Sequence, residues 1–315
     1  MPKKFSVASA SSEVLAGSGG TQTADAAQGE AALGRLESVL ADLERVVVAF
    51  SGGADSALVA AVATRVLGPG NALCATAVSA SLAPDERAHC AGLAARWGLR
   101  WVEVPTAELE DPAYVANDLD RCYHCKRELM DVLMPLAVSE NATVVLGVNL
   151  DDLTDHRPGQ KAAAERGAGF PLVEAGLDKA TVRALSRAIG LETWDRPAAA
   201  CLASRVPHGT PVTFGILDQV GRAESALRRL GFSALRVRHY GDLARIEIPL
   251  DDLDRALLIR DEVVAAVRGA GYRYVTLDLE GLRSGNLSHA AVAAAAGPDR
   301  PGKASAALRP ADLDS

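Results

Sequence analysis

The segment Ser51-Gly-Gly-Ala-Asp-Ser56 constrains the fold of this chain more than any other. The apolar run before it, residues 46–50, predicts a short buried strand. Residues 56–67 after it have the length and composition of a helix, which a Gly-Pro-Gly sequence ends. A helix that starts directly after such a loop points free backbone N–H groups at an anion. The sequence therefore predicts a phosphate-binding loop between a strand and a helix.

The individual residues of this loop suit that task. Gly52 and Gly53 allow backbone conformations closed to other residues and let a ligand approach the main chain. Ser51 and Ser56 add hydroxyl donors, and Asp55 is a candidate ligand for Mg²⁺, which prefers carboxylate oxygen. The alternative is a glycine-rich turn in which Ser or Asp only caps a helix. The loop is not a Walker motif, because no Gly-Lys-Ser/Thr follows.

Strand and helix patterns alternate through the first two thirds of the chain. Further strands are expected at 72–78, 100–104 and 143–146, and further helices at 84–97, near 126–138 and at 181–189. This alternation predicts an α/β fold with a doubly wound parallel sheet.

After about residue 200 the pattern changes to a smaller α+β unit. Helices are expected at 214–230 and 253–267, and strands at 234–238, 243–248 and 274–279. We therefore expect a nucleotide-binding domain over residues 31–200 and a second, substrate domain over residues 201–290. Residues 1–30 and 291–315 are rich in small residues and are expected to be disordered tails.

Composition limits the classes of partner. The formal net charge is −7 and the pI about 5.5, so the chain has no basic footprint for nucleic acid. No apolar run is long enough to cross a bilayer, and no signal-peptide core is visible, so we expect a cytoplasmic protein without membrane contact. Five cysteines, an odd number, argue against a disulfide framework.

A second cluster of candidates follows the strand expected at 143–146. Gly147 would permit close approach of an adenine, and Asp152 is a candidate metal ligand together with Asp55. The alternative for the acidic residues is a solvated turn that starts a helix. Ser79, just past the second strand, either contacts the nucleotide or caps a turn.

Two places in the sequence have cysteines that are candidates for a function. Cys122 and Cys125 form a Cys-x-x-Cys pair, but zinc usually needs four ligands and no second pair exists. A structural helix start is the favoured interpretation there, with Arg121 and Lys126 as candidate contacts to a substrate phosphate. Cys201 lies in an irregular segment near the domain boundary, the kind of place where pockets form.

Positive charge surrounds Cys201 in the sequence. Arg196, Arg205 and His208 would favour its thiolate, which is the nucleophilic form of cysteine. Such a thiolate is a nucleophile that can attack an activated acyl group. The alternative is a buried cysteine in a linker.

The loop at 51–56 resembles that of the N-type ATP pyrophosphatases, or PP-loop enzymes. That resemblance implies ATP as cosubstrate, attack at the α-phosphate and release of pyrophosphate. Several segments in order resemble a narrower family, the LarE family of ATP-dependent sacrificial sulfur transferases, over about residues 31–290: residues 121–126, 155–159, 197–210 and 276–285.

This resemblance implies the chemistry and the substrate. ATP with Mg²⁺ would adenylate a carboxylate of pyridinium-3,5-biscarboxylic acid mononucleotide, in the biosynthesis of the nickel-pincer nucleotide cofactor of lactate racemase. Cys201, by its position in the motif, would form a thioester and then lose its sulfur, leaving dehydroalanine. Some members hold an iron–sulfur cluster with three cysteines, but Ser204 stands three residues after Cys201 here. The chain therefore resembles the single-cysteine kind, and the family implies a homo-oligomer such as a hexamer.

Roles for the neighbours of Cys201 follow from this chemistry. A substrate phosphate needs cations, and the candidates are Arg205, Arg236 and Arg238. Removal of the cysteine Cα proton needs a general base, for which Glu224 is the first candidate and Asp278 or Glu280 are others. Each carboxylate has an alternative role as a surface salt-bridge partner.

Two rival functions remain open at the level of the sequence. One is a tRNA-thiolating or amidating PP-loop enzyme, which the acidic pI weakens and a salt-dependent tRNA shift would reveal. The other is a non-catalytic ATP-binding regulator, which would release no pyrophosphate.

Overall fold

The computed structural model describes residues 19–154, 158–196 and 201–283, and the chain forms two compact units. The first unit contains residues 1–77, 88–104 and 129–198. The second contains residues 78–87, 105–128 and 199–315. Each unit therefore collects segments from distant parts of the chain. Within the described residues, no helix is long and apolar enough to span a bilayer.

The first unit is built on a four-stranded sheet with the order β3-β2-β1-β4. Strand β1 pairs in parallel with β2 on one side and with β4 on the other. The strands are β1 Val46–Ala49, β2 Ala72–Val78, β3 Arg100–Pro105 and β4 Thr143–Leu146. The strand order reverses between β1 and β4, where open α/β sheets bind ligands at the carboxyl ends of the strands. The expected doubly wound α/β fold is confirmed.

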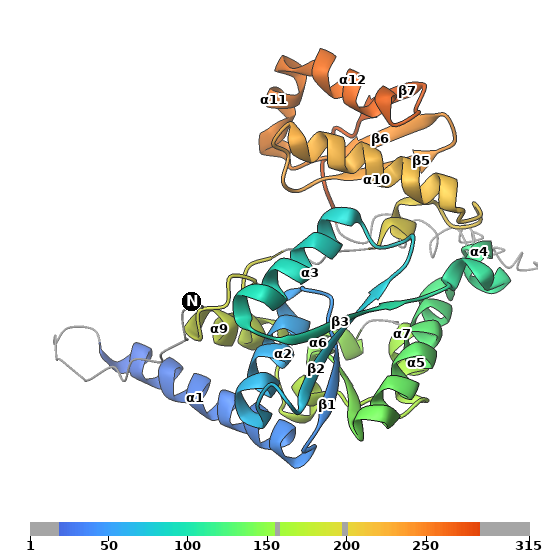
Figure 1. Ribbon diagram of the computed structural model, residues 1–315. Coiled ribbons are helices and arrows are strands. Elements are labelled where there is room, and N and C mark those ends of the chain that lie inside the picture. Colours follow the sequence, from blue (N-terminus) through green and yellow to red (C-terminus); the bar gives the residue numbers. More distant parts are fainter. Residues whose placement is uncertain (1–18, 155–157, 197–200, 284–315) are drawn as a thin grey trace, which may run out of the picture. The chain divides into compact units, whose positions relative to one another are not determined.

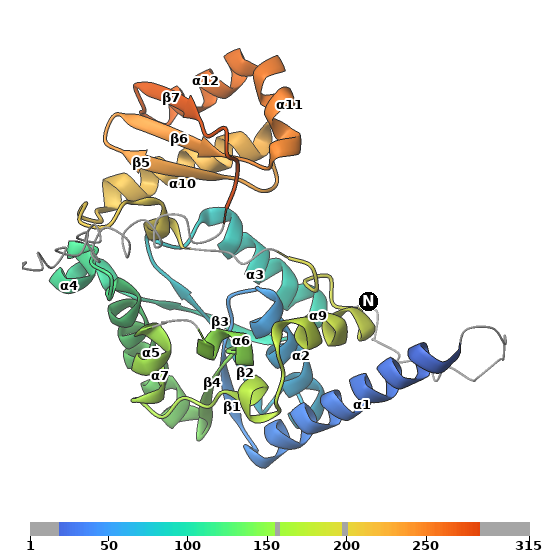
Figure 2. The ribbon, with the colours of Figure 1, turned by 180° about the vertical axis from the view of Figure 1, so that it is seen from behind.

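Helices cover both faces of this sheet, on either side of β1 (Figures 1 and 2). Alternate residues of β1 point to opposite faces, so Val46 and Val48 pack in one apolar cluster and Val47 in another. The first cluster includes side chains of α1, α2 and α9, and the second includes side chains of α5. The helices are α1 Gly19–Asp42, α2 Ala54–Leu67, α3 Pro84–Trp97, α5 Arg121–Glu140, α6 Leu150–Thr154, α7 Pro158–Ala164, α8 Pro171–Glu174 and α9 Lys179–Ala188.

The second unit contains a three-stranded sheet of order β5-β6-β7. Strands β5 and β6 are antiparallel, and β6 and β7 are parallel. Its elements are η1 Glu108–Glu110, α4 Pro112–Ala116, η2 Leu202–Arg205, α10 Phe214–Arg229, β5 Arg236–Tyr240, β6 Leu243–Glu247, η3 Leu250–Asp252, α11 Leu253–Leu258, α12 Arg260–Gly269 and β7 Tyr274–Leu277. Helices α10 and α12 pack on this sheet through Leu227, Val237 and Val267.

The N-terminal tail is shorter than expected, because α1 already begins at Gly19. In the second half of α1, Ala32, Leu36 and Leu40 are buried at helical spacing. The small polar residues before Ala32 hid the start of the helix. The helix expected at 253–267 is two helices, α11 and α12, which join at Ile259. Residues 1–18 and the tail expected at 291–315 lie outside the described residues.

Candidate active site

The backbone of the phosphate loop, residues 51–56, requires glycine at position 52. Gly52 has φ +69°, a left-handed conformation that side chains rarely adopt. A Cβ atom there would also lie 3.0 Å from Cys90 Sγ and 3.0 Å from His89 Cδ2. Both strain and crowding therefore exclude a side chain at this position.

Two serines hold the loop closed. The Ser51 N–H donates to Ser56 Oγ (3.2 Å), and the two serine hydroxyls lie 3.1 Å apart. The Ser56 hydroxyl also donates to the Gly53 carbonyl oxygen (3.2 Å). Gly53 occupies the N-cap of α2 and has no side chain with which to cap it. The first-turn N–H groups of α2 thus keep no side-chain cap, the arrangement that favours an anion.

Asp55 is the acidic group of this loop. Burial raises the pKa of its carboxyl, and the nearby Asp152 raises it further, while Asn149 and Lys179 act in the opposite direction. The Asn149 side-chain amide donates to Asp55 Oδ1 (2.8 Å). Asn149 was not among the sequence-predicted site residues, although it follows β4 beside β1, and that position was a signal available in the sequence.

Asp55 and Asp152 suit a magnesium ion that keeps most of its ligands from phosphate and water. Asp152 and Asn149 are joined by two hydrogen bonds. The Asn149 N–H donates to Asp152 Oδ2 (3.3 Å), and the Asp152 N–H donates to Asn149 Oδ1 (3.2 Å). Mg²⁺ in nucleotide sites is held by one or two carboxylates together with substrate phosphates. The described residues contain no group of three or more His, Cys, Asp or Glu side chains placed to hold a metal by themselves.

Gly147 has a packing role that the sequence did not reveal. A Cβ atom on it would lie 2.6 Å from the Ser56 backbone nitrogen and 2.8 Å from the Asp55 carbonyl carbon. These are main-chain atoms of the first turn of α2, which cannot give way. The absent side chain lets β4 exit directly against the phosphate loop, and contact with adenine stays a prediction.

Two candidates from the sequence are engaged locally. The Arg196 guanidinium donates to the Gly52 carbonyl oxygen (3.1 Å), so it braces the phosphate loop. The Ser79 hydroxyl lies 2.9 Å from that of Ser81 and accepts from the Ser81 N–H, which is the turn-capping alternative. Residues 155–157 and 197–200 of the motif segments lie outside the described residues.

Cys201 occupies the N-cap of the short turn η2 in the second unit and is half-buried. Its carbonyl oxygen accepts two hydrogen bonds, from the Ser204 N–H (2.9 Å) and from Arg205 Nη1 (3.3 Å). The next N–H, of Leu202, donates to the Ser81 carbonyl oxygen (2.9 Å). The peptide group between Cys201 and Leu202 is therefore held by hydrogen bonds at both its carbonyl oxygen and its N–H.

Arg205 and Glu224 form a buried, two-point ion pair. Arg205 Nε lies 2.7 Å from Glu224 Oε1, and Arg205 Nη2 lies 3.1 Å from Glu224 Oε2. Arg228 donates to the same carboxylate (3.0 Å), and so does the Val237 N–H (3.0 Å). Glu224 has no exposed surface. A carboxylate with four such donors is poorly suited to act as a general base, so the geometry favours a positioning role for Glu224.

Arginines gather around this pair. Arg238, which is almost fully buried, pairs with Glu247 (2.8 Å) and donates to the Ser204 carbonyl oxygen (2.8 Å). Arg236 donates to the Arg283 carbonyl oxygen (2.8 Å) and makes no carboxylate ion pair within the described chain. Burial, then the nearby Arg238 and Arg205, lowers the pKa of Arg236. A half-buried cation among other cations favours an anion such as phosphate.

Arg121 connects segments within the second unit through hydrogen bonds. Its side chain is buried and donates to the Asn117 side chain and to the Ala203 carbonyl oxygen (2.9 Å). The expected phosphate contact by Arg121 therefore conflicts with its position, because its guanidinium already ties α5 to η2. His208 was expected to favour the thiolate of Cys201. A ring nitrogen of His208 instead lies 3.2 Å from the Asn117 carbonyl oxygen.

The Cys-x-x-Cys pair is not arranged as a metal site. Cys122 is exposed, whereas burial raises the pKa of Cys125 to about 12, with the neighbouring Lys126 opposing that shift. The Cys125 thiol points at the carboxylate of Glu108 (3.9 Å). A neutral, buried thiol is the form that packs rather than reacts.

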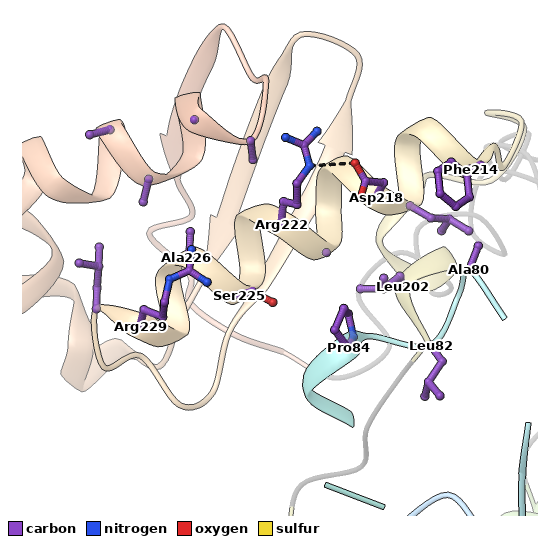
Figure 3. Close-up of a pocket in the computed structure, with 17 residues that line it drawn as sticks. Ala80, Leu82, Pro84, Leu202, Phe214, Asp218, Arg222, Ser225, Ala226 and Arg229 are labelled. Carbon is purple, nitrogen blue, oxygen red and sulfur yellow. Dashed lines mark hydrogen bonds and ion pairs between the residues drawn. The ribbon is translucent and has the colours of Figure 1, made fainter. Parts of the chain in front are cut away.

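A hollow of about 680 Å³ opens in the second unit between α10, α12 and the segment before α3 (Figure 3). Leu202, the residue after Cys201, lies near Ala80 and Phe214 at one end of it. Arg222 and Asp218 on α10 form an ion pair at its edge (2.8 Å). The wall is otherwise mostly apolar.

Comparison with known proteins places these features in context. A family model described as NAD synthase matches residues 35–149. A pyridinium-3,5-bisthiocarboxylic acid mononucleotide synthase of Lactiplantibacillus plantarum is 39% identical over 254 residues, which cover 80% of this chain and 92% of that protein. An uncharacterised protein of Synechocystis sp. is 46% identical over 82% of this chain and 97% of its own. Another, of Methanocaldococcus jannaschii, is 26% identical over 76% of this chain and 92% of its own.

Proposed function

Because this chain belongs to the LarE family of ATP-dependent sulfur transferases, we propose that it converts a carboxylate of pyridinium-3,5-biscarboxylic acid mononucleotide to a thiocarboxylate at the expense of its own Cys201. The chain is an enzyme of nickel-pincer nucleotide cofactor biosynthesis. The observation that carries the role of Cys201 is its position, half-buried on a fixed turn beside a cluster of arginines.

The phosphate loop activates the carboxylate. The uncapped N-terminus of α2 and the hydroxyls of Ser51 and Ser56 hold the β- and γ-phosphates of ATP. Asp55 and Asp152 would hold Mg²⁺, which would neutralise phosphate charge. A substrate carboxylate oxygen attacks the α-phosphate, the bond to the bridging oxygen breaks, and pyrophosphate leaves. The product of this step is an acyl adenylate.

The second unit supplies the sulfur. The Cys201 thiolate attacks the acyl carbon, AMP leaves with the electron pair of the acyl–oxygen bond, and a thioester remains. Arg236 binds the phosphate of the substrate nucleotide, and the nearby Arg238 adds positive charge. Breaking the Cys201 Cβ–Sγ bond then releases the thiocarboxylate and leaves dehydroalanine. The single cysteine of this segment, with Ser204 three residues later, supports a sacrificial donor.

The cellular setting follows from the same chemistry. We propose that the chain works in the cytoplasm, where ATP is available and thiols stay reduced. All five cysteines are free, which suits that compartment. The product would serve the maturation of a lactate racemase. Assembly as a homo-oligomer, such as a hexamer, stays a prediction.

The test is a mass measurement on the protein itself. Purified protein is incubated with ATP, Mg²⁺ and the dicarboxylated pyridinium nucleotide, and its peptides are compared before and after. The Cys201 peptide should become lighter by the mass of hydrogen sulfide, while the Cys122 and Cys125 peptides stay unchanged. The variant Cys201→Ser should still release pyrophosphate but give no thiolated product. Thiolated product from wild type with Cys201 intact would overturn the assignment of the donor.

A further inference from the structure

The carbonyl oxygen of Cys201 accepts two hydrogen bonds, one of them from a charged side chain. Its bond from the Ser204 N–H (2.9 Å) is the ordinary hydrogen bond of a 3₁₀ turn. Its second bond, from Arg205 Nη1 (3.3 Å), comes from a buried guanidinium that carries a full positive charge. Arg121 and Arg238 also donate to peptide oxygens of this turn, those of Ala203 and Ser204, but of these three arginines only Arg205 donates to the oxygen of the proposed sulfur donor.

That oxygen takes part in the last step of sulfur transfer. When the Cα proton of a thioester-bound cysteine is removed, the electron pair that is left behind delocalises onto the carbonyl oxygen of the same residue. For Cys201 that atom is the one held by Ser204 and Arg205. Donors aimed at the atom where negative charge develops stabilise a transition state more than the ground state.

We propose that the turn formed by residues 201–205 is an oxyanion site for the enolate of Cys201 itself, with the Arg205 guanidinium and the Ser204 N–H as its two donors. The proposal rests on the proposed function and adds the catalytic groups of its elimination step. The proton passes from Cα to water, and the charge rests on the Cys201 oxygen. The carbonyl bond then re-forms, Cα and Cβ become doubly bonded, and the thiocarboxylate leaves with the electron pair of the Cβ–Sγ bond.

The surroundings keep this site rigid. Glu224 grips Arg205 through two bonds (2.7 and 3.1 Å), and Arg228 and the Val237 N–H hold Glu224. Arg205 Nη1 also donates to the Ser204 hydroxyl (3.0 Å). Arg238 fixes the other side of the turn through the Ser204 carbonyl oxygen (2.8 Å). Glu224 is therefore a positioning residue, and a preorganised donor need not reorganise during the reaction.

A chemical elimination tests the proposal without ATP or substrate. The reagent 2,5-dibromohexanediamide converts cysteine thiols into cyclic sulfonium groups, which leave by the same loss of the Cα proton. Cys122 of the same molecule is exposed and serves as the internal reference. Peptide mass spectra follow the decay of each sulfonium adduct to dehydroalanine. Decay at Cys201 should be about 100-fold faster than at Cys122, the usual effect of an oxyanion donor.

Variants locate the effect at Arg205. Arg205→Lys keeps the charge that Glu224 needs but lacks the guanidinium fork, so the decay at Cys201 should fall to within a few fold of that at Cys122. Arg96→Lys, at an exposed arginine paired with Glu192 (2.7 Å), is the matched control and should change neither rate. If Arg205→Lys does not fold, Glu224→Gln loosens the same guanidinium and should give an intermediate rate. Equal decay at Cys201 and Cys122 in the wild type would overturn the proposal.

The full reaction separates this proposal from the proposed function. With ATP and the pyridinium nucleotide, Arg205→Lys should release pyrophosphate normally and accumulate the Cys201 thioester, with dehydroalanine formation about 100-fold slower than in wild type. Loss of pyrophosphate release in the wild type would count against the proposed function alone. Unchanged dehydroalanine formation in Arg205→Lys would count against the oxyanion site alone.

Discussion

At the scale of single residues, the buried carboxylate of Asp55 lowers the stability of the folded protein, although it is a candidate ligand for magnesium. Burial raises the pKa of its carboxyl. Between the ordinary pKa of 3.8 and the raised folded value, the folded state binds more protons than the unfolded state. Stability therefore falls as the pH rises through that window, and the loss is complete above the raised folded value.

The variant Asp55→Asn should accordingly be more stable than wild type at neutral pH, with an advantage that narrows as the pH is lowered through the window. It should also weaken magnesium-dependent ATP binding by at least about 10- to 100-fold, the range seen when even the outer partners of a metal are lost. Thermal unfolding across pH and ATP titration measure the two effects. The exposed Asp151, replaced by Asn, is the control. A destabilised Asp55→Asn at pH 7 would contradict this account.

At the scale of elements, the Glu224 carboxylate joins α10, η2 and β5. Replacing it by Ala removes the buried carboxylate that faces the Arg205 guanidinium, which should lower the free energy of unfolding by about 3–5 kcal/mol. The double variant Glu224→Met with Arg205→Met should recover a large part of that loss, because both charges are then absent. Urea unfolding measures these differences.

The same helix offers a matched control for this prediction. Asp218 and Arg222 form an exposed ion pair one turn apart on α10. Asp218→Ala should lower the free energy of unfolding by no more than about 1 kcal/mol. If Asp218→Ala and Glu224→Ala lowered the free energy of unfolding by similar amounts, burial would not determine the contribution of the Arg205–Glu224 pair.

The packing of β4 against α2 depends on Gly147. In Gly147→Ala the new Cβ would stand 2.6 Å from a main-chain nitrogen of the phosphate loop. The strain should lower stability by about 1–3 kcal/mol and reduce ATP affinity, since the loop must shift. Gly34→Ala, inside α1 with nothing within 4 Å of the new Cβ, should instead stabilise by about 0.5–1 kcal/mol. Melting temperatures and ATP titration separate the two, and an unaffected Gly147→Ala would refute the packing role.

The elements themselves were largely readable from the sequence. Periodicity located β1, β2, α3 and β4 because their apolar residues face a core on one or both sides. The short helices α4, α6, α7 and α8 were missed, since four to seven residues do not establish a period. The break at Ile259 between α11 and α12 was missed because no Gly or Pro marks it.

At the scale of the whole molecule, the sequence provided candidate site residues but not the groups that contact them. The phosphate loop was predicted from its own residues, because its geometry is local. The burial of Arg121 and Glu224 was not, because it depends on contacts with other elements: Ala203 lies 82 residues from Arg121, and Val237 lies on β5 whereas Glu224 lies on α10. The second unit likewise gathers residues 78–87 and 105–128 with the C-terminal part, which no linear division of the chain anticipates.

The single donor cysteine limits what one molecule can do. Under the proposed function each chain gives up the sulfur of Cys201 once, and no second cysteine follows it to carry a replacement. The related synthase is named for a product with two thiocarboxylates. If this chain makes the same product, each fully thiolated molecule should consume two chains. With excess ATP and substrate, the thiocarboxylate groups formed should therefore stop at one per protein chain, with dehydroalanine at position 201 in every chain.

This limit can be measured by titration. Thiolated product is quantified against protein at several protein concentrations, with intact mass reporting the spent fraction. The variant Cys122→Ser should reach the same plateau, since Cys122 donates no sulfur. Product in excess of protein would show that sulfur is replenished, and the sacrificial assignment would then be wrong.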